Sequence, residues 1–266
     1  MERKKSNSKS IERVSQSAEK LLLIMEYLAA KRIPVRLQDA AEDLKIPEPT
    51  LLRYFTALIK HNYMYQDEDN LRYSLTWKIC SLGQQINNYL SIRSICGPYL
   101  NEMAYEFNSG VCLAVMKDYE SIYLDLVDNT NAFMRSLQRI GKRAPLNTTA
   151  SGKILLTQLS DREIEGFIQV MGLTKVTEKT ITEKERFLKE LETIRNQGYA
   201  IDDEECELGI RCVSAPLRDY KNDIVAAISS FDDSELMTES RIHNEILPKL
   251  LEMTCKISMR FGYTKD

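Results

Sequence analysis

The spacing of apolar residues predicts a helical front part of this 266-residue chain. From Ser17, apolar side chains recur every three or four residues, and this period predicts three short helices, over about 17–30, 37–44 and 50–60. Residues 63–65 and 71–75 form two short apolar runs around a polar turn, which predicts a two-stranded wing. Three helices followed by a hairpin are the layout of a winged helix-turn-helix, whose second helix of the pair enters the major groove of DNA.

The rear part of the chain mixes strand and helix patterns. Helical spacing predicts a linking helix over 77–94, and Gly97-Pro98 predicts a domain boundary after it. Four strands are expected, over 111–116, 122–127, 213–217 and 224–229. Further helices are expected over 99–108, 151–158 and 239–261, and after capping boxes at Ser160 and Thr182. Adjacent strand pairs among helices predict an α+β fold with an antiparallel sheet.

Charge and composition favour a soluble cytoplasmic protein with a basic front. Residues 1–78 carry 14 Lys and Arg against 11 acids, whereas the rest of the chain carries 22 against 28. No apolar run approaches the roughly 20 residues that cross a bilayer, and the first ten residues lack the apolar core of a secretory signal. Six cysteines show no CxxC spacing and there are two histidines, so we expect reduced thiols, no metal site and no cofactor.

The helix over 50–60 is the candidate groove-reading helix. Arg53 is suited to a guanine edge or to a phosphate, and the spacing does not decide between them. The candidate DNA-binding residues are Lys45, Thr50, Leu52, Arg53, Thr56, Lys60 and Arg72. The wing tip carries the acids 67–69, which argues against its deep insertion into a groove. The alternative is a three-helix unit that binds protein or simply packs.

An acidic run near the C-terminal third of the chain is the second candidate site. Asp202-Asp203-Glu204-Glu205 precede Gly209-Ile210-Arg211-Cys212, and this combination leaves three chemistries open. Cys212 is a candidate nucleophile if its pKa is lowered by a nearby base. A carboxylate metal site is a second possibility, although consecutive residues on an extended chain point to opposite faces and cannot all bind one ion. A solvated acidic loop is the third.

Several segments resemble the IclR family of bacterial regulators, in the same order and over nearly the whole chain. In the front part these segments are 18–28, 46–53 and 72–83; in the rear part they are 146–153, 202–212 and 226–229. The resemblance implies a winged helix-turn-helix (15–77) after a flexible basic arm (1–14), a linker helix (78–96), and a GAF-like effector-binding and oligomerisation domain (97–266). It also implies homodimers or tetramers on palindromic operators, and no enzymatic activity.

The resemblance further implies an effector site in the rear domain. The implied lining residues are Leu146, Ala150, Ser151, Gly152, Asp202, Cys212 and Ser229. Backbone N–H groups around Gly152 would hold a ligand carboxylate at the start of a helix, and Asp202 would accept a hydrogen bond from a ligand hydroxyl. The chain departs from the family pattern at Pro49, at Asn62 and at Asn147, where histidine is frequent.

The sequence therefore predicts a ligand-responsive DNA-binding repressor of a catabolic operon that senses a small carboxylate. Two alternatives stay open at this point. One is a small-molecule enzyme that uses Cys212 and carries an N-terminal interaction module. The other is a regulator that works without a ligand.

Overall fold

The computed structural model describes residues 15–87, 91–127 and 140–264. The chain forms two compact units, which comprise residues 1–89 and 90–266. In the described residues, no helix is both long enough and apolar enough to cross a membrane. The predicted α+β class is confirmed, with helices and a small sheet in the first unit and a six-stranded antiparallel sheet in the second.

The N-terminal unit is a winged helix-turn-helix. Its elements are α1 (Gln16–Lys31), α2 (Leu37–Leu44), α3 (Glu48–Lys60), β1 (Met64–Gln66), β2 (Tyr73–Leu75) and α4 (Lys78–Asn87). Helix α3 starts with Pro49 in its first turn, where the missing N–H group has no partner in any case. Phe55 of α3 packs edge-on against Tyr73 of β2, with ring centroids 4.7 Å apart. The wing is thereby fixed to the buried side of α3.

The expected single helix over 77–94 is wrong. Helix α4 ends at Asn87, and a new helix, α5 (Ile92–Phe107), begins after Ser91. Ser91 and Ser94 form a reciprocal capping box, which the sequence pattern of the helix interior did not reveal. Pro98 lies inside α5, so Gly97-Pro98 does not separate two elements as expected. The predicted boundaries of the linker segment stay predictions.

The C-terminal unit is built on one antiparallel sheet with the strand order β5-β4-β3-β8-β7-β6. Its strands are β3 (Gly110–Lys117), β4 (Glu120–Val127), β5 (Arg143–Pro145), β6 (Ala200–Asp203), β7 (Ile210–Arg218) and β8 (Ile224–Asp233). Its other helices are α6 (Ala150–Leu156), α7 (Asp161–Met171), α8 (Lys184–Gln197), α9 (Glu239–Arg241), the π-helical turn η2 (Ile242–Ile246) and α10 (Leu247–Arg260). The edge strands β5 and β6 are short, and the sequence analysis did not anticipate them.

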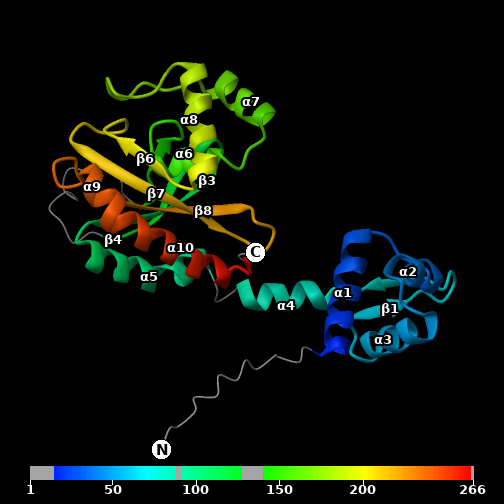
Figure 1. Cartoon of the computed structure of the whole chain (residues 1–266). Helices are drawn as coiled ribbons and strands as arrows, with labels where there is room; N and C mark the ends of the chain where they lie inside the picture. Colours follow the sequence, from blue (N-terminus) through cyan, green and yellow to red (C-terminus); the bar gives the residue numbers. More distant parts are fainter. Residues whose placement is uncertain (1–14, 88–90, 128–139, 265–266) are drawn as a thin grey trace, which may run out of the picture. The chain divides into compact units, whose positions relative to one another are not determined.

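The large sheet carries a hydrophobic core on each face. Figure 1 shows α5 and α10 on one face and α6 and α8 on the other. Tyr123, Ile154 and Phe187 belong to the core on the α6 and α8 side, whereas Leu100 and Leu250 belong to the core under α5 and α10. This three-layer arrangement allows a buried site to form on the α6 side without disturbing the other core.

One of the two expected capping boxes is present. Ser160 caps α7, and the Glu163 carboxylate accepts a hydrogen bond from the Ser160 N–H group at 2.8 Å. The box expected at Thr182 is wrong, because α8 begins one residue later with Glu183 at its N-cap and without a side-chain cap.

Within the stretch that pairs with residues 111–117 of β3, strand β4 contains one extra residue. Tyr123 and Asp125 pair with neighbouring residues of β3, so Leu124 between them is extra and forms a β-bulge. Tyr123 packs in the core on the α6 side, and Leu124 packs in the core on the α5 side. Leu126 returns to the α6 side, so the bulge changes which residues of β4 face each core.

Candidate functional site

The predicted groove-reading residues lie on the outer side of α3. Leu51 and Phe55 are buried, which turns Leu52, Arg53 and Thr56 outward at helical spacing. Lys60, in the last turn of α3, is also exposed, and Thr50 is half-buried. The Thr56 hydroxyl donates to the Leu52 carbonyl at 2.8 Å, so its oxygen remains as an acceptor for a partner outside the helix.

The other two predicted DNA contacts differ in how they are held. Lys45 follows α2 in a left-handed conformation and is exposed. Arg72 is half-buried and donates to the Pro34 carbonyl at 3.0 Å, which ties β2 to the turn before α2. Asp67 at the wing tip accepts hydrogen bonds from the Asp69 and Asn70 N–H groups, so this acid shapes the turn.

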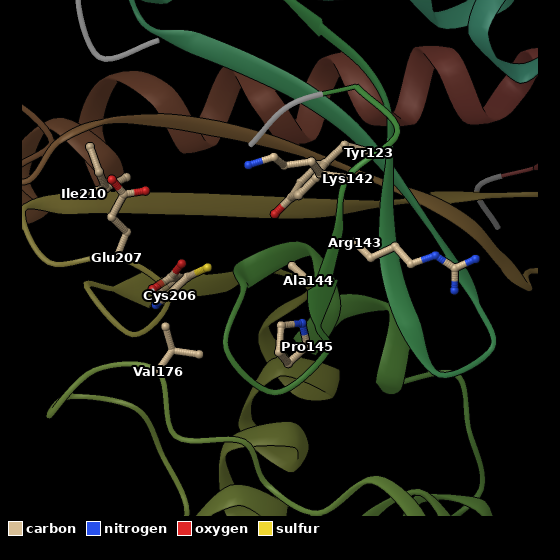
Figure 2. Close-up of a pocket in the computed structure, with 10 residues that line it drawn as sticks. Tyr123, Lys142, Arg143, Ala144, Pro145, Val176, Cys206, Glu207 and Ile210 are labelled. Carbon is tan, nitrogen blue, oxygen red and sulfur yellow. Dashed lines mark hydrogen bonds between the residues drawn. The ribbon is translucent and has the colours of Figure 1, made fainter. Parts of the chain in front are cut away.

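A cavity of about 150 Å³ opens on the α6 side of the sheet. Its lining residues come from β4, from β5 and the residue before it, from the segment after α7, and from β6, the start of β7 and the connection between them; they are Tyr123, Lys142, Arg143, Ala144, Pro145, Val176, Asp202, Cys206, Glu207 and Ile210. Figure 2 shows the Tyr123 hydroxyl pointing toward the side of the cavity where Cys206 lies. In the same view the Arg143 side chain points away from this space. Apolar groups therefore form most of the wall, and a few polar groups converge on it.

Asp202 is the one predicted effector residue that lines this cavity. The other six predicted residues are buried and are not among those that line it; they are Leu146, Ala150, Ser151, Gly152, Cys212 and Ser229. Asp202 is held by hydrogen bonds from the Glu205 N–H group (2.7 Å) and the Cys206 N–H group (3.2 Å) to its Oδ1. Burial raises the pKa of Asp202 to about 7, while Lys153 nearby opposes that rise. The carboxyl group is thus able to exist in either protonation state near neutral pH.

Lys153 is a functional candidate that the sequence analysis missed. Its side chain is 1% exposed, and its Nζ contacts Glu205 Oε1 at 2.6 Å and Glu190 Oε1 at 3.2 Å. Burial lowers the pKa of Lys153, but the two carboxylates outweigh it and the net shift is upward. Through these two ion pairs, Lys153 of α6 connects the turn that follows Asp202 with α8. No local signal predicted this, because Lys153 and Glu205 are far apart in the sequence.

The start of α6 is tightly packed and already capped. Thr149 Oγ1 accepts from the Gly152 N–H group at 3.0 Å, so that N–H group is used within the protein. A Cβ atom at Gly152 would lie 2.3 Å from the Leu146 carbonyl oxygen, which explains why glycine stands there. Ser151 Oγ lies 3.4 Å from Ser121 Oγ of β4. These contacts lock α6 against β4 beside the cavity.

Asn147, which departs from the family pattern, has a positioning role. Its amide donates to the Thr174 carbonyl at 2.9 Å and accepts from the Thr174 N–H group at 3.2 Å. This pair of hydrogen bonds holds the segment that places Val176 in the cavity wall. Asn147 therefore acts on the cavity through Val176.

Three buried side-chain oxygens remain poorly satisfied within the described part of the chain: those of Tyr123 and Ser229, and one carboxylate oxygen of Glu205. Tyr123 Oη is buried and has no hydrogen-bond partner among the described residues. Ser229 Oγ has only a weak hydrogen bond with the Cys112 thiol. Most buried polar groups in proteins have a partner, so such oxygens need an explanation. The apolar pattern over 122–127 predicted the strand that carries Tyr123, but no local signal placed this residue at a cavity.

The thiols and acids around the cavity do not form a reactive or metal-binding centre. Burial raises the pKa of Cys112 and of Cys206 to about 12, which disfavours their nucleophilic thiolate forms. Cys212 is buried in the same core. Within residues 15–87, 91–127 and 140–264, no cluster of three or more His, Cys, Asp or Glu side chains has the geometry to hold a metal ion.

Comparisons with known proteins agree with this architecture. Residues 84–259 match the family described as bacterial transcriptional regulator IclR C-terminal, and residues 17–68 match the IclR helix-turn-helix domain. The HTH-type transcriptional regulator XynR of Escherichia coli is 28% identical over 229 residues, 84% of this chain and 90% of XynR. The HTH-type transcriptional repressor AllR of Salmonella typhimurium is 26% identical over 227 residues, 85% of this chain and 83% of AllR. The crystal structure of the Thermotoga maritima IclR is similar with a TM-score of 0.62 and 28% identity, covering 93% of this chain and 99% of that one.

Proposed function

Because the chain belongs to the IclR family of bacterial transcriptional regulators, we propose that it represses a catabolic operon and that a small carboxylate controls its binding to a palindromic operator. It is a DNA-binding regulator with an effector-binding domain, and proteins of this family are not enzymes. The alternative of catalysis by Cys212 is therefore overturned. Repression is supported by the relative AllR, which is named a repressor.

The observation that carries the sensor proposal is the cavity beside Asp202. A volume of about 150 Å³ suits a molecule of roughly benzene size. Lys142 is exposed at its mouth and has no ion-pair partner in the described part of the chain, so it is available to a ligand anion. The buried polar groups at the inner end add directional hydrogen bonding, as in most small-molecule sites.

The operator proposal follows from the single reading helix per chain. A helix-turn-helix monomer reads one half-site, and a symmetric dimer or tetramer places two such helices on a palindrome. We therefore propose a homodimer or tetramer that acts on chromosomal DNA in the cytoplasm. The ligand must bind one arrangement of the oligomer more tightly than another, and such coupling is typically about 1–3 kcal/mol.

A binding experiment with one variant and one matched control tests the DNA-binding proposal. Duplexes selected from a random library by the full chain would be titrated with wild type, Arg53→Ala and Arg186→Ala, with fluorescence anisotropy as the readout. Arg186 is also an exposed arginine, but it lies on α8 in the other unit, so its loss should leave affinity unchanged. We expect Arg53→Ala to weaken binding by roughly tenfold or more. Equal affinity of all three proteins would remove α3 from the interface.

The sensor proposal is tested by repeating the titration with small carboxylic acids. An acid that raises the melting temperature of the protein and also changes its affinity for the selected duplex supports it. If acids of this size neither bind nor change DNA affinity, while Arg53→Ala still weakens binding, the chain is a regulator without a carboxylate effector.

A further inference from the structure

The Tyr123 hydroxyl has no use in the protein itself. The side chain is 2% exposed, its ring packs in the core on the α6 side, and Oη has no hydrogen-bond partner among the described residues. Figure 2 shows this hydroxyl directed into the cavity. A phenylalanine would pack equally well without leaving an unsatisfied oxygen, so the hydroxyl points to a partner that enters the cavity.

The surroundings of the hydroxyl narrow the choice of partner. Burial raises the pKa of Tyr123 well above its ordinary value, and the nearby Asp202 carboxylate raises it further. The phenol therefore keeps its proton and acts as a donor. Asp202 lines the same cavity and, when ionised, acts as an acceptor.

We propose, building on the sensor function above, that Tyr123 determines the specificity of the cavity for hydroxycarboxylic acids. A ligand hydroxyl can accept a hydrogen bond from Tyr123 Oη and donate one to Asp202 at the same time. A plain carboxylic acid offers neither group at this end of the cavity. The effector is therefore a hydroxy acid of roughly six to ten non-hydrogen atoms, as the cavity volume allows.

The charges around the cavity set the orientation of this ligand. A carboxylate at the inner end would lie beside Asp202 in a buried environment, where like charges repel strongly. Lys142 lies at the exposed mouth, whereas Arg143 is engaged by Glu120 at 2.6 Å. The carboxylate of the ligand therefore faces Lys142, and its hydroxyl reaches Tyr123.

Paired acids that differ by one hydroxyl test the inference. Full-length wild type, Tyr123→Phe and the control Tyr105→Phe, which alters a side chain 84% exposed on α5, would be titrated calorimetrically. The pairs are lactate and propionate, 3-hydroxybutyrate and butyrate, and 3-hydroxybenzoate and benzoate. In wild type and the control, we expect at least one hydroxy acid to bind roughly tenfold more tightly than its partner, the effect of about one hydrogen bond. In Tyr123→Phe this preference should disappear.

The melting temperature of the unliganded protein separates a ligand role from a structural one. Tyr123→Phe should melt at or above the wild-type temperature, because it removes an unsatisfied buried hydroxyl. A lower melting temperature, or a hydroxyl preference that survives in Tyr123→Phe, would overturn the assignment. Acids that bind and alter DNA affinity without any hydroxyl preference would overturn it too, while leaving the sensor function intact. If none of the six acids binds, both the specificity assignment and the carboxylate sensor fail, and DNA binding is judged separately by Arg53→Ala.

Discussion

The outer side of α3 and the cavity beside Asp202 use polar side chains in opposite ways. On α3, Leu52, Arg53 and Thr56 are exposed, and the fold below them depends on Leu51 and Phe55 instead. The reading residues are thus free to change without loss of the fold. Their hydrogen-bonding groups are available because the protein places few demands on them.

The cavity, in contrast, takes Asp202 from a buried polar cluster that the fold also requires. Lys153, Asp202 and Glu205 are each less than a tenth exposed, and they hold one another or the local backbone. A substitution there changes stability as well as ligand binding. A substitution on α3 is therefore expected to weaken DNA binding without loss of stability. A substitution near the cavity is expected to weaken the ligand response and lower the stability of the fold, so unfolding measurements distinguish the two cases.

The largest effect is expected for Lys153→Ala. Removal of the lysine leaves Glu205 buried without its 2.6 Å partner, and breaking a buried ion pair in this way typically costs about 3–5 kcal/mol. Urea unfolding would measure the free energy of unfolding. The control Lys184→Ala removes a surface ion pair with Glu165 and should cost less than about 1 kcal/mol. Equal losses in the two variants would contradict the structural role of Lys153.

Asp202→Asn should change the pH dependence of stability. Burial raises the pKa of Asp202 from 3.8 to about 7, so between these values the folded chain keeps a proton that the unfolded chain has lost. The contribution of Asp202 to stability therefore falls as the pH rises through this window. Asparagine keeps the acceptor oxygen for the Glu205 and Cys206 N–H groups but does not titrate.

Unfolding of wild type and Asp202→Asn between pH 4.5 and pH 8 would check this sign. The variant should gain stability relative to wild type by up to about 1.4 kcal/mol per pH unit until the pH passes the folded pKa. A constant difference across the range would show that Asp202 is ionised throughout.

A smaller loss is expected for Gly152→Ala. The added Cβ atom would meet the Leu146 backbone at 2.3 Å, and such overpacking typically costs about 1–3 kcal/mol. Gly166, inside α7, has open space at the corresponding position, so Gly166→Ala should stabilise the protein by about 0.5–1 kcal/mol. Opposite signs of the two changes in thermal unfolding would support the close packing of α6. A neutral Gly152→Ala would show that α6 has room to move.

The smallest stability change is expected for Arg53→Ala. The side chain is exposed on α3, and surface substitutions usually change the free energy of unfolding by no more than about 0.5 kcal/mol. Its unfolding curve should therefore overlay that of wild type while its affinity for DNA falls. A loss of several kcal/mol would mean that weaker DNA binding reflects a damaged fold, and the contrast between the two regions would be lost.

The N-terminal unit was predictable from sequence because its signals are local. Apolar period, Pro49 and the polar turn after β1 act within a few residues, and they define α3 and the wing. The cavity was less accessible. Tyr123, Lys142 and Cys206 come from separate strands and loops, and nothing in their local sequence indicates that they meet. Family resemblance supplied Asp202, whereas the Lys153–Glu205 pair required the folded arrangement.

The extra residue in β4 has a consequence for how this protein family can evolve. Because Leu124 is inserted opposite β3, Asp125 lies on the α5 side, where its carboxylate pairs with Arg93 at 3.1 Å. If the strand kept Leu124 but formed no bulge, the regular alternation would turn Asp125 into the apolar core in place of Leu126. Mutations that replace one amino acid with another can therefore remodel the cavity wall along β4 gradually. Deletion of Leu124 would remove the bulge and leave a regular alternation in which Asp125 keeps the α5 side and Leu126 keeps the α6 side, so the strand can also lose this one residue without burying a charge.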